Sequence, residues 1–346
     1  MTIQQSGRLM SNLVKLLNDE WGAEAKAIKP LSEGLHSKNW LVISKGEEHY
    51  ILRELHGLRL REQTKVELDY LNYLNKSDFD YNVPKPISTR GKKAYAEKGN
   101  TTLWLYRYIN GTAKEKLGAK EIGEIARLMI SYHKIIRNYH SKYKIKKATA
   151  DPFGRTELLA WSKYLQNIAK KNKSPLDKTY LHSIKPLLPI LKKLDIPGYE
   201  DLETFSINAD IKCENILWKG GSIVALLDFD NIGRIEHPLV KDLAVTIQYS
   251  FLTKRKNYIN KQLSGYFISA YRKKLPLSKV EIRSIPFLII SHYINMLNYT
   301  YMLTKHGRIA KLNKLARTVE EQLIIYKNAA VWTYNNYESL VKCLDT

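Results

Sequence analysis

Three polar residues with a distinctive spacing stand out in this chain, Asp210, Asn215 and Asp228. The Asn follows the first Asp by five residues and precedes the second by thirteen. A β-rich run begins directly after Asn215, and a second apolar run, residues 223–227, ends at Asp228. The Lys-Gly-Gly-Ser between these runs is typical of a turn. The sequence therefore predicts a hairpin that brings Asn215 and Asp228 close to each other.

This pattern fits the chemistry of phosphoryl transfer. That reaction needs a carboxylate near the acceptor hydroxyl, and an Asn and an Asp that hold Mg²⁺ on the nucleotide phosphates. Asp210 is the candidate for the first role, and Asn215 and Asp228 are the candidates for the second. We expect Asp230 either to assist the metal or to stabilise the loop. An ordinary hairpin with polar ends would not need these residue types at these spacings.

Residues 208–230 resemble the signature of the aminoglycoside phosphotransferase/choline kinase superfamily, which reads His-Gly-Asp-x-x-x-x-Asn, a hairpin, then Asp-x-Asp. The resemblance places Asp210 on the catalytic Asp, Asn215 on the metal-binding Asn, and Asp228 on the Asp of the protein-kinase Asp-Phe-Gly motif. It implies an α+β, bilobal protein-kinase-like fold. A small β-rich N-terminal lobe is expected over residues 1–105, and a larger, mainly helical C-terminal lobe over residues 106–346.

The catalytic segment also departs from the family pattern. Asn208-Ala209 stands where the family has His-Gly, although an Asn side chain can still make hydrogen bonds. Lys212, two residues after Asp210, resembles the protein-kinase lysine that meets the transferred phosphate. A solvated loop lysine is the equal alternative. The catalytic candidates are therefore Asp210 and Lys212.

The N-terminal third carries the expected nucleotide-binding residues. A loop from Gly34 to Asn39 precedes an apolar strand, and the resemblance implies that its backbone N–H groups cover the phosphates of ATP. Arg53 ends the next predicted strand, where kinase-like folds have a phosphate-neutralising Lys. Glu67 on the following predicted helix is its expected partner, with Glu62 as the fallback. An exposed helix carboxylate is the alternative for Glu67.

A buried-type strand over residues 102–109 closes at an Asn-Gly turn. The resemblance implies that residues 105–109 form the hinge whose main chain binds adenine. Leu105, Arg107 and Ile109 are its expected contact residues. Another core strand is the ordinary alternative.

Two further residues lie where the family has functional groups. His133 lies on the apolar face of a predicted helix, where a hydrogen-bonded core histidine is expected rather than a catalyst. Asp242 resembles the family Asp that opens a helix and braces the catalytic loop, and a plain first-turn acid is the alternative. The two cysteines, Cys213 and Cys343, support no disulfide framework or zinc site and fit a reducing compartment.

The composition limits the class of protein. The chain has 346 residues, 44% hydrophobic and 26% charged, as in a globular protein. No apolar run approaches the roughly 20 residues needed to span a bilayer, and the start lacks the pattern of a signal peptide. A cytoplasmic location is expected. The net charge of +22 reflects either solvated lysine-rich faces or an anionic partner. There is no basic repeat and no zinc-finger spacing, so nucleic-acid binding has no specific support.

The short link between Asp228 and Asp242 decides between protein and small-molecule acceptors. A protein kinase needs a long activation segment there, and neither Gly-x-Gly-x-x-Gly nor Val-Ala-Ile-Lys occurs in the chain. The sequence therefore predicts an ATP- and Mg²⁺-dependent phosphotransferase that acts on a hydroxyl of a small molecule.

The charge of the C-terminal part bears on the acceptor. Residues 243–346 contain 16 Lys and Arg against 5 Asp and Glu. A polycationic aminoglycoside calls for a cluster of carboxylates, so a neutral or anionic metabolite, an amino alcohol or a sugar is favoured. The chain also resembles homoserine kinase type II and spore-coat relatives in the superfamily. A kinase-like binding or structural protein with weak or no catalysis, and an aminoglycoside-type antibiotic kinase, are the alternatives.

Overall fold

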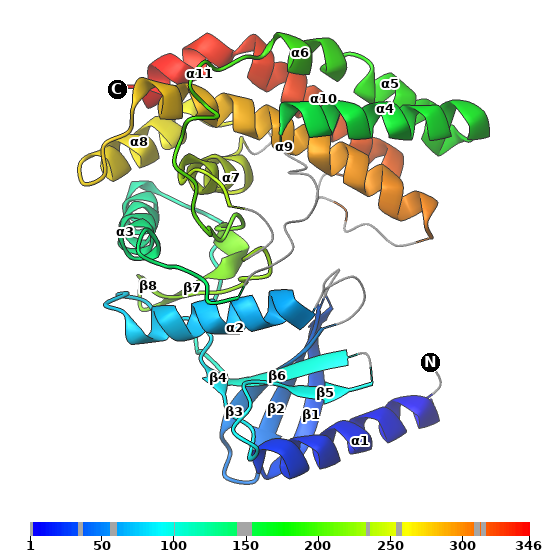
Figure 1. The fold of residues 1–346 in the computed structure, drawn as a ribbon, viewed down its shortest axis with the longest axis vertical. Helices are drawn as coiled ribbons and strands as arrows, with labels where there is room; N and C mark the ends of the chain where they lie inside the picture. Colours follow the sequence, from blue (N-terminus) through cyan, green and yellow to red (C-terminus); the bar gives the residue numbers. More distant parts are fainter. Residues whose placement is uncertain are drawn as a thin grey trace. The chain divides into compact units, whose positions relative to one another are not determined.

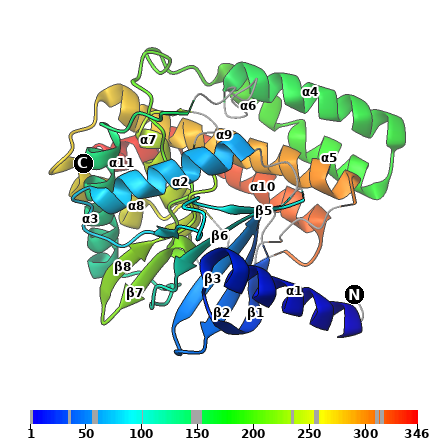
Figure 2. The same ribbon diagram turned by 60° about the horizontal axis from the view of Figure 1, so that its bottom comes forward.

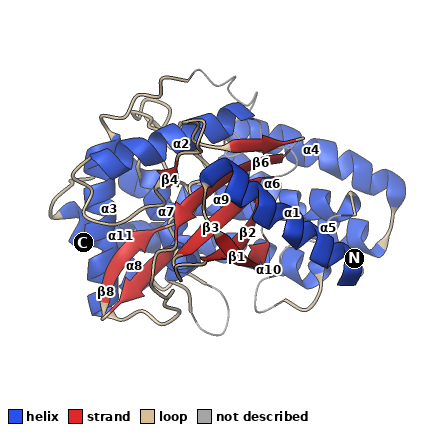
Figure 3. Cartoon of the chain, turned by 90° about the horizontal axis from the view of Figure 1, so that it is seen from below, coloured by secondary structure: helices blue, strands red, loops and turns tan. Residues whose placement is uncertain are grey.

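The computed structural model describes residues 3–33, 37–55, 61–99, 101–143, 154–232, 236–253, 258–307, 312 and 316–346. The chain divides into two compact units. Unit 1 comprises residues 1–113, 134–145 and 216–234, and unit 2 comprises residues 114–133, 146–215 and 235–346. All strands of the described residues, red in Figure 3, belong to unit 1, whereas helices α4 to α11 belong to unit 2.

A six-stranded antiparallel sheet forms the centre of unit 1. Its order is β1-β2-β3-β6-β4, and β5 also pairs with β6. Strands β3 and β6, far apart in sequence, are neighbours, and Arg53 of β3 pairs with Trp104 of β6. The strands are β1 (Ala25–Glu33), β2 (Ser37–Ser44), β3 (His49–Leu55), β4 (Pro86–Ile87), β5 (Ala96–Lys98) and β6 (Thr101–Arg107).

Two helices cover opposite sides of this sheet (Figure 1). Helix α1 (Ile3–Trp21) crosses one face of the sheet (Figure 2), and its Leu13 and Leu17 join a core with Leu52, Leu103 and Leu105. Side chains alternate along a strand. The residues next to these leucines, Arg53 and Trp104 among them, therefore face the other side, where α2 (Arg61–Lys76) runs.

The predicted hairpin is present as β7 (Ile216–Lys219) and β8 (Ser222–Leu226). Gly220 and Gly221 between them have φ of 59° and 88°. Two consecutive positive φ angles are the geometry of a type I′ turn, which glycine adopts at little cost. The turn prediction is confirmed.

This hairpin packs into unit 1 although it follows the catalytic segment in sequence. The Asn82 N–H donates to the carbonyl of Val224 at 3.0 Å, and Thr112 and Trp218 exchange main-chain hydrogen bonds. A Cβ on Gly111 would lie 2.9 Å from the Leu217 Cβ, so glycine permits this close approach. The units defined by contacts are therefore discontinuous, whereas the sequence prediction drew one boundary at residues 105/106.

Unit 2 is helical. Helix α9 (Lys279–Lys305) is at its centre and packs against α4, α7, α10 and α11. Helix α7 (Val240–Ser250) is buried along most of its length. The other helices are α4 (Arg155–Asn172), α5 (Pro175–Ile184), α6 (Leu187–Lys193), α8 (Lys261–Arg272), α10 (Val319–Asn335) and α11 (Tyr337–Leu344), and α3 (Ala119–Ile136) runs from unit 2 into unit 1.

The predicted α+β class, with a β-sheet in the N-terminal part and a mostly helical C-terminal part, is confirmed. Among the described residues, none of the helices combines the length and the apolar character required to cross a membrane.

Candidate active site

Unit 1 contains a buried arginine held between carboxylates. The Arg53 side chain is 6% exposed, and its Nη2 donates to Asp228 Oδ1 at 3.2 Å and to Asp230. Burial alone would lower the pKa of Arg53, but the negative charges of Asp230, Glu67 and Asp228 outweigh it and raise that pKa. Arg53 is therefore a permanent cation beside the predicted metal-binding carboxylates.

The structure places two other predicted nucleotide-binding residues next to Arg53. Glu67 on α2 is fully buried and adds to the negative field on Arg53, whereas Glu62 is exposed. Asn39 of β2 lies directly opposite Arg53 in the strand register, so the two side chains share a face of the sheet. Gly34 lies outside the described residues, and its predicted role stays a prediction.

The predicted hinge leaves the sheet at the end of β6. Leu105 is inside the sheet, and its side chain belongs to the core under α1. Arg107 ends the ladder opposite Tyr50, and its exposed guanidinium donates to Glu48 at 3.0 Å. Ile109 follows after the last strand residue. Of the three predicted adenine contacts, Arg107 and Ile109 are thus the two at the end of the strand.

A cavity of about 780 Å³ in unit 1 is lined by Arg107, Ile109, Lys85, Lys219 and Val224, among others. Arg107 shares its face of β6 with Leu105, whereas Arg53 pairs on the opposite face. The lining of this cavity includes neither Arg53 nor Asp228 and Asp230. The cavity and the cluster of Arg53, Asp228 and Asp230 therefore lie on opposite sides of strand β6.

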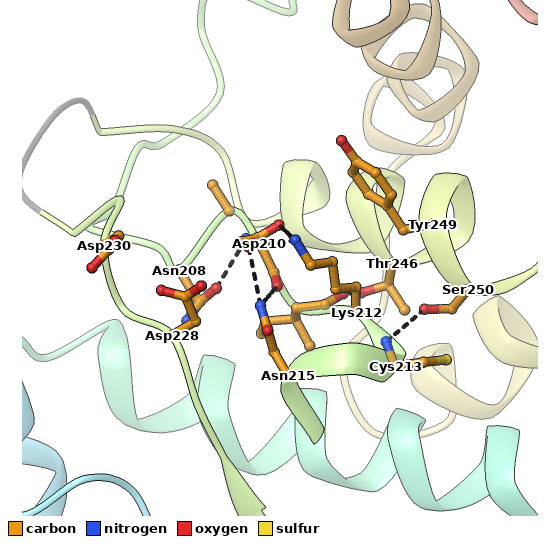
Figure 4. A network of polar contacts seen from close by, with 12 residues as sticks. Asn208, Asp210, Lys212, Cys213, Asn215, Asp228, Asp230, Thr246, Tyr249 and Ser250 are labelled. Carbon is orange, nitrogen blue, oxygen red and sulfur yellow. Dashed lines mark hydrogen bonds and ion pairs between the residues drawn. The ribbon is translucent and has the colours of Figure 1, made fainter. Parts of the chain in front are cut away.

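Unit 2 contains the predicted catalytic loop (Figure 4). Lys212 Nζ donates to both carboxylate oxygens of Asp210 at 2.8 Å. Asn215 Nδ2 donates to the Asp210 main-chain carbonyl at 2.9 Å and to Asp210 Oδ2 at 3.0 Å. The Asp210 N–H donates to Asn208 Oδ1 at 2.9 Å. The structure thus brings Asp210, Lys212 and Asn215 together, and Asn208 braces the loop with its side-chain oxygen.

Helix α7 holds alternate residues of this loop. Asp242 Oδ1 accepts from the Ala209 N–H at 2.7 Å, the Thr246 hydroxyl donates to the Ile211 carbonyl at 2.7 Å, and Ser250 Oγ accepts from the Cys213 N–H at 3.1 Å. Four helical residues rise about 6 Å, close to the length of two extended residues. An i, i+4, i+8 polar stripe therefore matches the i, i+2, i+4 spacing of the loop.

Sequence reasoning identified Asp242 in this stripe but missed Thr246 and Ser250. The available signal was three short polar side chains, four residues apart, along helix α7. His133 is fully buried and its ring contacts the Tyr271 hydroxyl at 2.8 Å and Asp242 Oδ2 at 3.2 Å. It is the hydrogen-bonded core histidine that the sequence predicts, and it positions Asp242.

Two site residues have left-handed backbone, Ala209 with φ of 54° and Asp228 with φ of 61°. This region disfavours residues that have a Cβ, and such strain is concentrated at functional sites. The signature that this segment resembles has Gly at this position, and Gly adopts a positive φ at little cost. The present chain keeps the conformation with Ala, whose N–H donates to Asp242 Oδ1.

Asn215, Asp228 and Asp230 were the predicted metal ligands. Both hydrogen bonds given for the Asn215 side chain use its nitrogen, which leaves its amide oxygen as the donor atom for a cation. Asp228 and Asp230 supply carboxylate oxygens with 37% and 18% side-chain exposure. Among the described residues, no three His, Cys, Asp or Glu side chains cluster as a metal site. Carboxylate and amide oxygens are ligand types that suit Mg²⁺, which keeps waters and binds phosphates. The metal-binding role of the three residues stays a prediction.

Comparison with solved structures reveals the fold. An amicoumacin kinase in complex with AMP-PNP, Ca²⁺ and Ami matches with a TM-score of 0.67 and 15% identity, over 95% of this chain and 96% of that chain. The chain has the kinase-like bilobal fold. A microcompartment-associated aminopropanol kinase matches with a TM-score of 0.63 and 14% identity, over 95% and 98% of the two chains.

Choline kinase from Cryptosporidium parvum matches with a TM-score of 0.55 and 16% identity, over 96% and 95% of the two chains. The three structures are those of small-molecule kinases by their names. No family model matches the chain, and no curated protein matches it in sequence. At identities this low the likeness establishes the fold, and the function must be argued from the site.

Proposed function

We propose that this protein transfers the γ-phosphoryl group of ATP, with Mg²⁺, to a hydroxyl of a small molecule. The observation that carries this proposal is the catalytic loop. Asp210, Lys212 and Asn215 form one hydrogen-bonded group, and α7 holds the backbone on which they stand. A protein that only bound a ligand would have no chemical need for this combination.

The side chains divide the work of the reaction. Asp210 accepts a hydrogen bond from the acceptor hydroxyl and takes its proton as the new bond forms. Lys212 is paired with Asp210. Its positive charge would stabilise the negative charge of the transferred phosphoryl group. Arg53 of unit 1 would neutralise the nucleotide phosphates, with buried Glu67 as its partner. Arg107 and Ile109 would offer main-chain groups to the base.

The predicted metal ligands complete the proposal. Asn215, through its amide oxygen, together with Asp228 and Asp230, would hold Mg²⁺. The ion would neutralise charge on the phosphates of ATP. Arg53 holds both Asp side chains in place, so they are positioned before any nucleotide arrives.

The acceptor is proposed to be a neutral or anionic metabolite, an amino alcohol or a sugar, because carboxylates are scarce among residues 243–346. Similar structures include a spectinomycin phosphotransferase and an aminopropanol kinase. An antibiotic kinase is therefore the second candidate. An anionic partner, one of the two explanations of the net charge, has no support in the comparisons. A cytoplasmic location stays a prediction.

Calorimetric titration with Mg·ATP tests the nucleotide and metal part of this proposal. We expect the wild type to bind ATP when Mg²⁺ is present and to bind it much more weakly in EDTA. Asp228→Ala should abolish Mg²⁺-dependent binding, while Asp201→Ala, at an exposed Asp, should bind as the wild type does. Failure of the wild type to bind Mg·ATP would refute the proposed function.

A further inference from the structure

The cavity of unit 1 has no part in the proposed phosphoryl transfer. Its volume is about 780 Å³, and all of its lining belongs to unit 1. The walls come from the end of α2, the segment that enters β4, residues 107–110 at the end of β6, and the β7–β8 hairpin. Pockets of roughly 300–1,000 Å³ hold small organic ligands. The cavity is therefore large enough for a ligand of its own.

Hydrogen bonds of the fold itself fix the walls of this cavity. The main-chain N–H and the side-chain amide of Asn82 both donate to the Val224 carbonyl, at 3.0 and 2.9 Å, and the Asn82 carbonyl accepts from the Leu226 N–H at 3.0 Å. Asn75 Nδ2 donates to the Pro84 carbonyl at 3.2 Å. These bonds join α2, the entry to β4 and the hairpin. The cavity thus needs no ligand to form, and binding would cost little ordering of the chain.

Part of the lining is apolar. Val83 is 4% exposed, and Ile87, which also packs against the core under α1, lines the cavity beside it. Ile109 and Val224 add two further aliphatic side chains from the hinge and the hairpin. These side chains can cover the apolar body of a ligand.

The charged part of the lining is entirely basic. It contains Lys85, Arg107 and Lys219 and, within the part of the chain that the structure describes, no Asp or Glu. Arg107 is paired with Glu48 at 3.0 Å, so its charge is largely balanced. Lys85 and Lys219 are exposed and form no ion pair or hydrogen bond with any described residue. The positive charge available to a ligand is therefore that of the two lysines.

These lysines do not belong to a lysine-rich stretch. Lys85 is the one charged residue in 81–89, and Lys219 is the one charged residue in 215–227. Pro84 and Pro86 on either side of Lys85 fix the backbone there. The fold brings these two isolated cations, 134 residues apart in sequence, to one cavity.

We infer that this cavity binds a small organic anion. Its apolar body packs on Val83, Ile109 and Val224, and its carboxylate or phosphate lies between Lys85 and Lys219. The site is separate from the proposed nucleotide phosphate site, because Arg53 and Asp228 lie on the opposite side of β6. The inference therefore does not depend on the proposed function.

Fluorinated probes that differ in charge give the test. 4-Fluorophenylacetate and 4-fluorophenyl phosphate carry an anion on an apolar ring, and 4-fluorophenylacetamide is the neutral counterpart of the first. Each is titrated with the full chain and followed by its ¹⁹F resonance. We expect saturable binding of both anions and at least fivefold weaker binding of the amide. Added salt should weaken the anions and not the amide, because the two lysines are exposed and their charges are screened.

Substitutions of the two lysines locate the bound probe. Lys85→Gln and Lys219→Gln should each lower the affinity for the anions about threefold, as for one exposed charge pair, and the double variant about tenfold. Lys98→Gln removes the same charge from an exposed position on β5 outside the lining and should leave the affinity unchanged. All three positions are exposed, so thermal unfolding should not differ among the variants.

Four results would overturn the inference: no saturable binding of either anion, equal binding of the amide, unchanged affinity in the double variant, or displacement of the probe by Mg·AMP-PNP. The last would place the probe at a nucleotide site. A protein that binds the probes as expected but does not bind Mg·AMP-PNP would refute the proposed function and leave this inference standing.

Discussion

The charged cluster of unit 1 and the catalytic loop of unit 2 are built in different ways. In unit 1, Arg53, Glu67 and Asp228 come from three distant segments and are held by charge around one buried guanidinium. In unit 2, Asp210, Lys212 and Asn215 lie within six consecutive residues and are held by hydrogen bonds to one another and to one helix. The first arrangement suits the binding of phosphates and a metal, and the second suits the exact placement of a base.

The largest expected effect is on the rate of phosphoryl transfer, and it follows from a change in unit 2. Asp210→Asn keeps the shape of the side chain but cannot take the proton of the acceptor. The rate of phosphoryl transfer should fall roughly 10²–10⁴-fold, while Mg·ATP affinity changes little. The slow hydrolysis of ATP with water as the acceptor measures this rate without a known substrate. Asp201→Asn, at an exposed Asp, is the control.

Acid should lower the free energy of unfolding of unit 2 because buried His292 must become protonated. Its pKa is lowered from an ordinary 6.5 to about 3, so the unfolded chain binds more protons between these values. The stability contributed by neutral His292 is complete above about pH 6.5 and declines as the pH falls toward 3.

Unfolding by urea across this pH range measures that decline, which should reach a few kcal/mol. His292→Gln should flatten the profile, and the remaining slope should include buried His237, whose pKa is also lowered. An unchanged slope in the variant would mean that His292 is protonated in the folded protein.

Arg53→Met tests whether charge holds unit 1 together. The change leaves Asp228, Asp230 and Glu67 without their cation, and the free energy of unfolding should fall by about 3–5 kcal/mol. Arg283→Met gives the matched surface case, because its pair with Glu338 has side-chain exposures of 46% and 73%. That change should cost less than about 1 kcal/mol. Equal losses in thermal or urea unfolding would contradict the central role of Arg53.

Thr246→Val tests the contact of α7 with the loop. It removes the hydrogen bond to the Ile211 carbonyl and should lower stability by about 1 kcal/mol. It should also lower the rate of transfer, because the loop carries Asp210. Thr333→Val removes a similar bond inside α10. A fall in rate with Thr333→Val as large as that with Thr246→Val would show that the loop contact has no special role.

Ala209→Gly is expected to give the smallest effect, and it is a gain. At φ of 54° the Cβ of Ala209 costs about 1–2 kcal/mol. Glycine removes this cost, but its greater freedom in the unfolded chain cancels part of the gain. Stability should rise by about 0.5–1 kcal/mol. Ala329→Gly, inside α10, should instead lose about 1 kcal/mol. Destabilisation by both changes would mean that the loop is not strained.

The same contrast explains what could be predicted from the sequence. The loop of unit 2 was predicted because Asp210, Lys212 and Asn215 are close in sequence, and their spacing carries the geometry. The turn at Gly220-Gly221 was predicted for the same reason. Thr246 and Ser250 were missed because they bind main-chain groups, and such bonds require no particular partner residue.

In unit 1 the roles of Arg53 and Glu67 came from the family resemblance and not from spacing. Their proximity to Asp228 depends on β3 pairing with β6 and on the hairpin packing into unit 1. Neither pairing has a local sequence signal. The discontinuous course of unit 1 could not be predicted for the same physical reason, since long-range contacts are chosen by the whole fold.

The most direct test is transfer of the γ-phosphoryl group itself. Wild type, Asp210→Asn and Asp228→Ala are each incubated with Mg²⁺, γ-labelled ATP and a mixture of hydroxylated metabolites, and labelled products are separated and counted. The account predicts labelled product from the wild type, with almost none from either variant, although Asp210→Asn still binds Mg·ATP. Equal transfer by Asp210→Asn, or no transfer by a wild type that binds Mg·ATP, would contradict it.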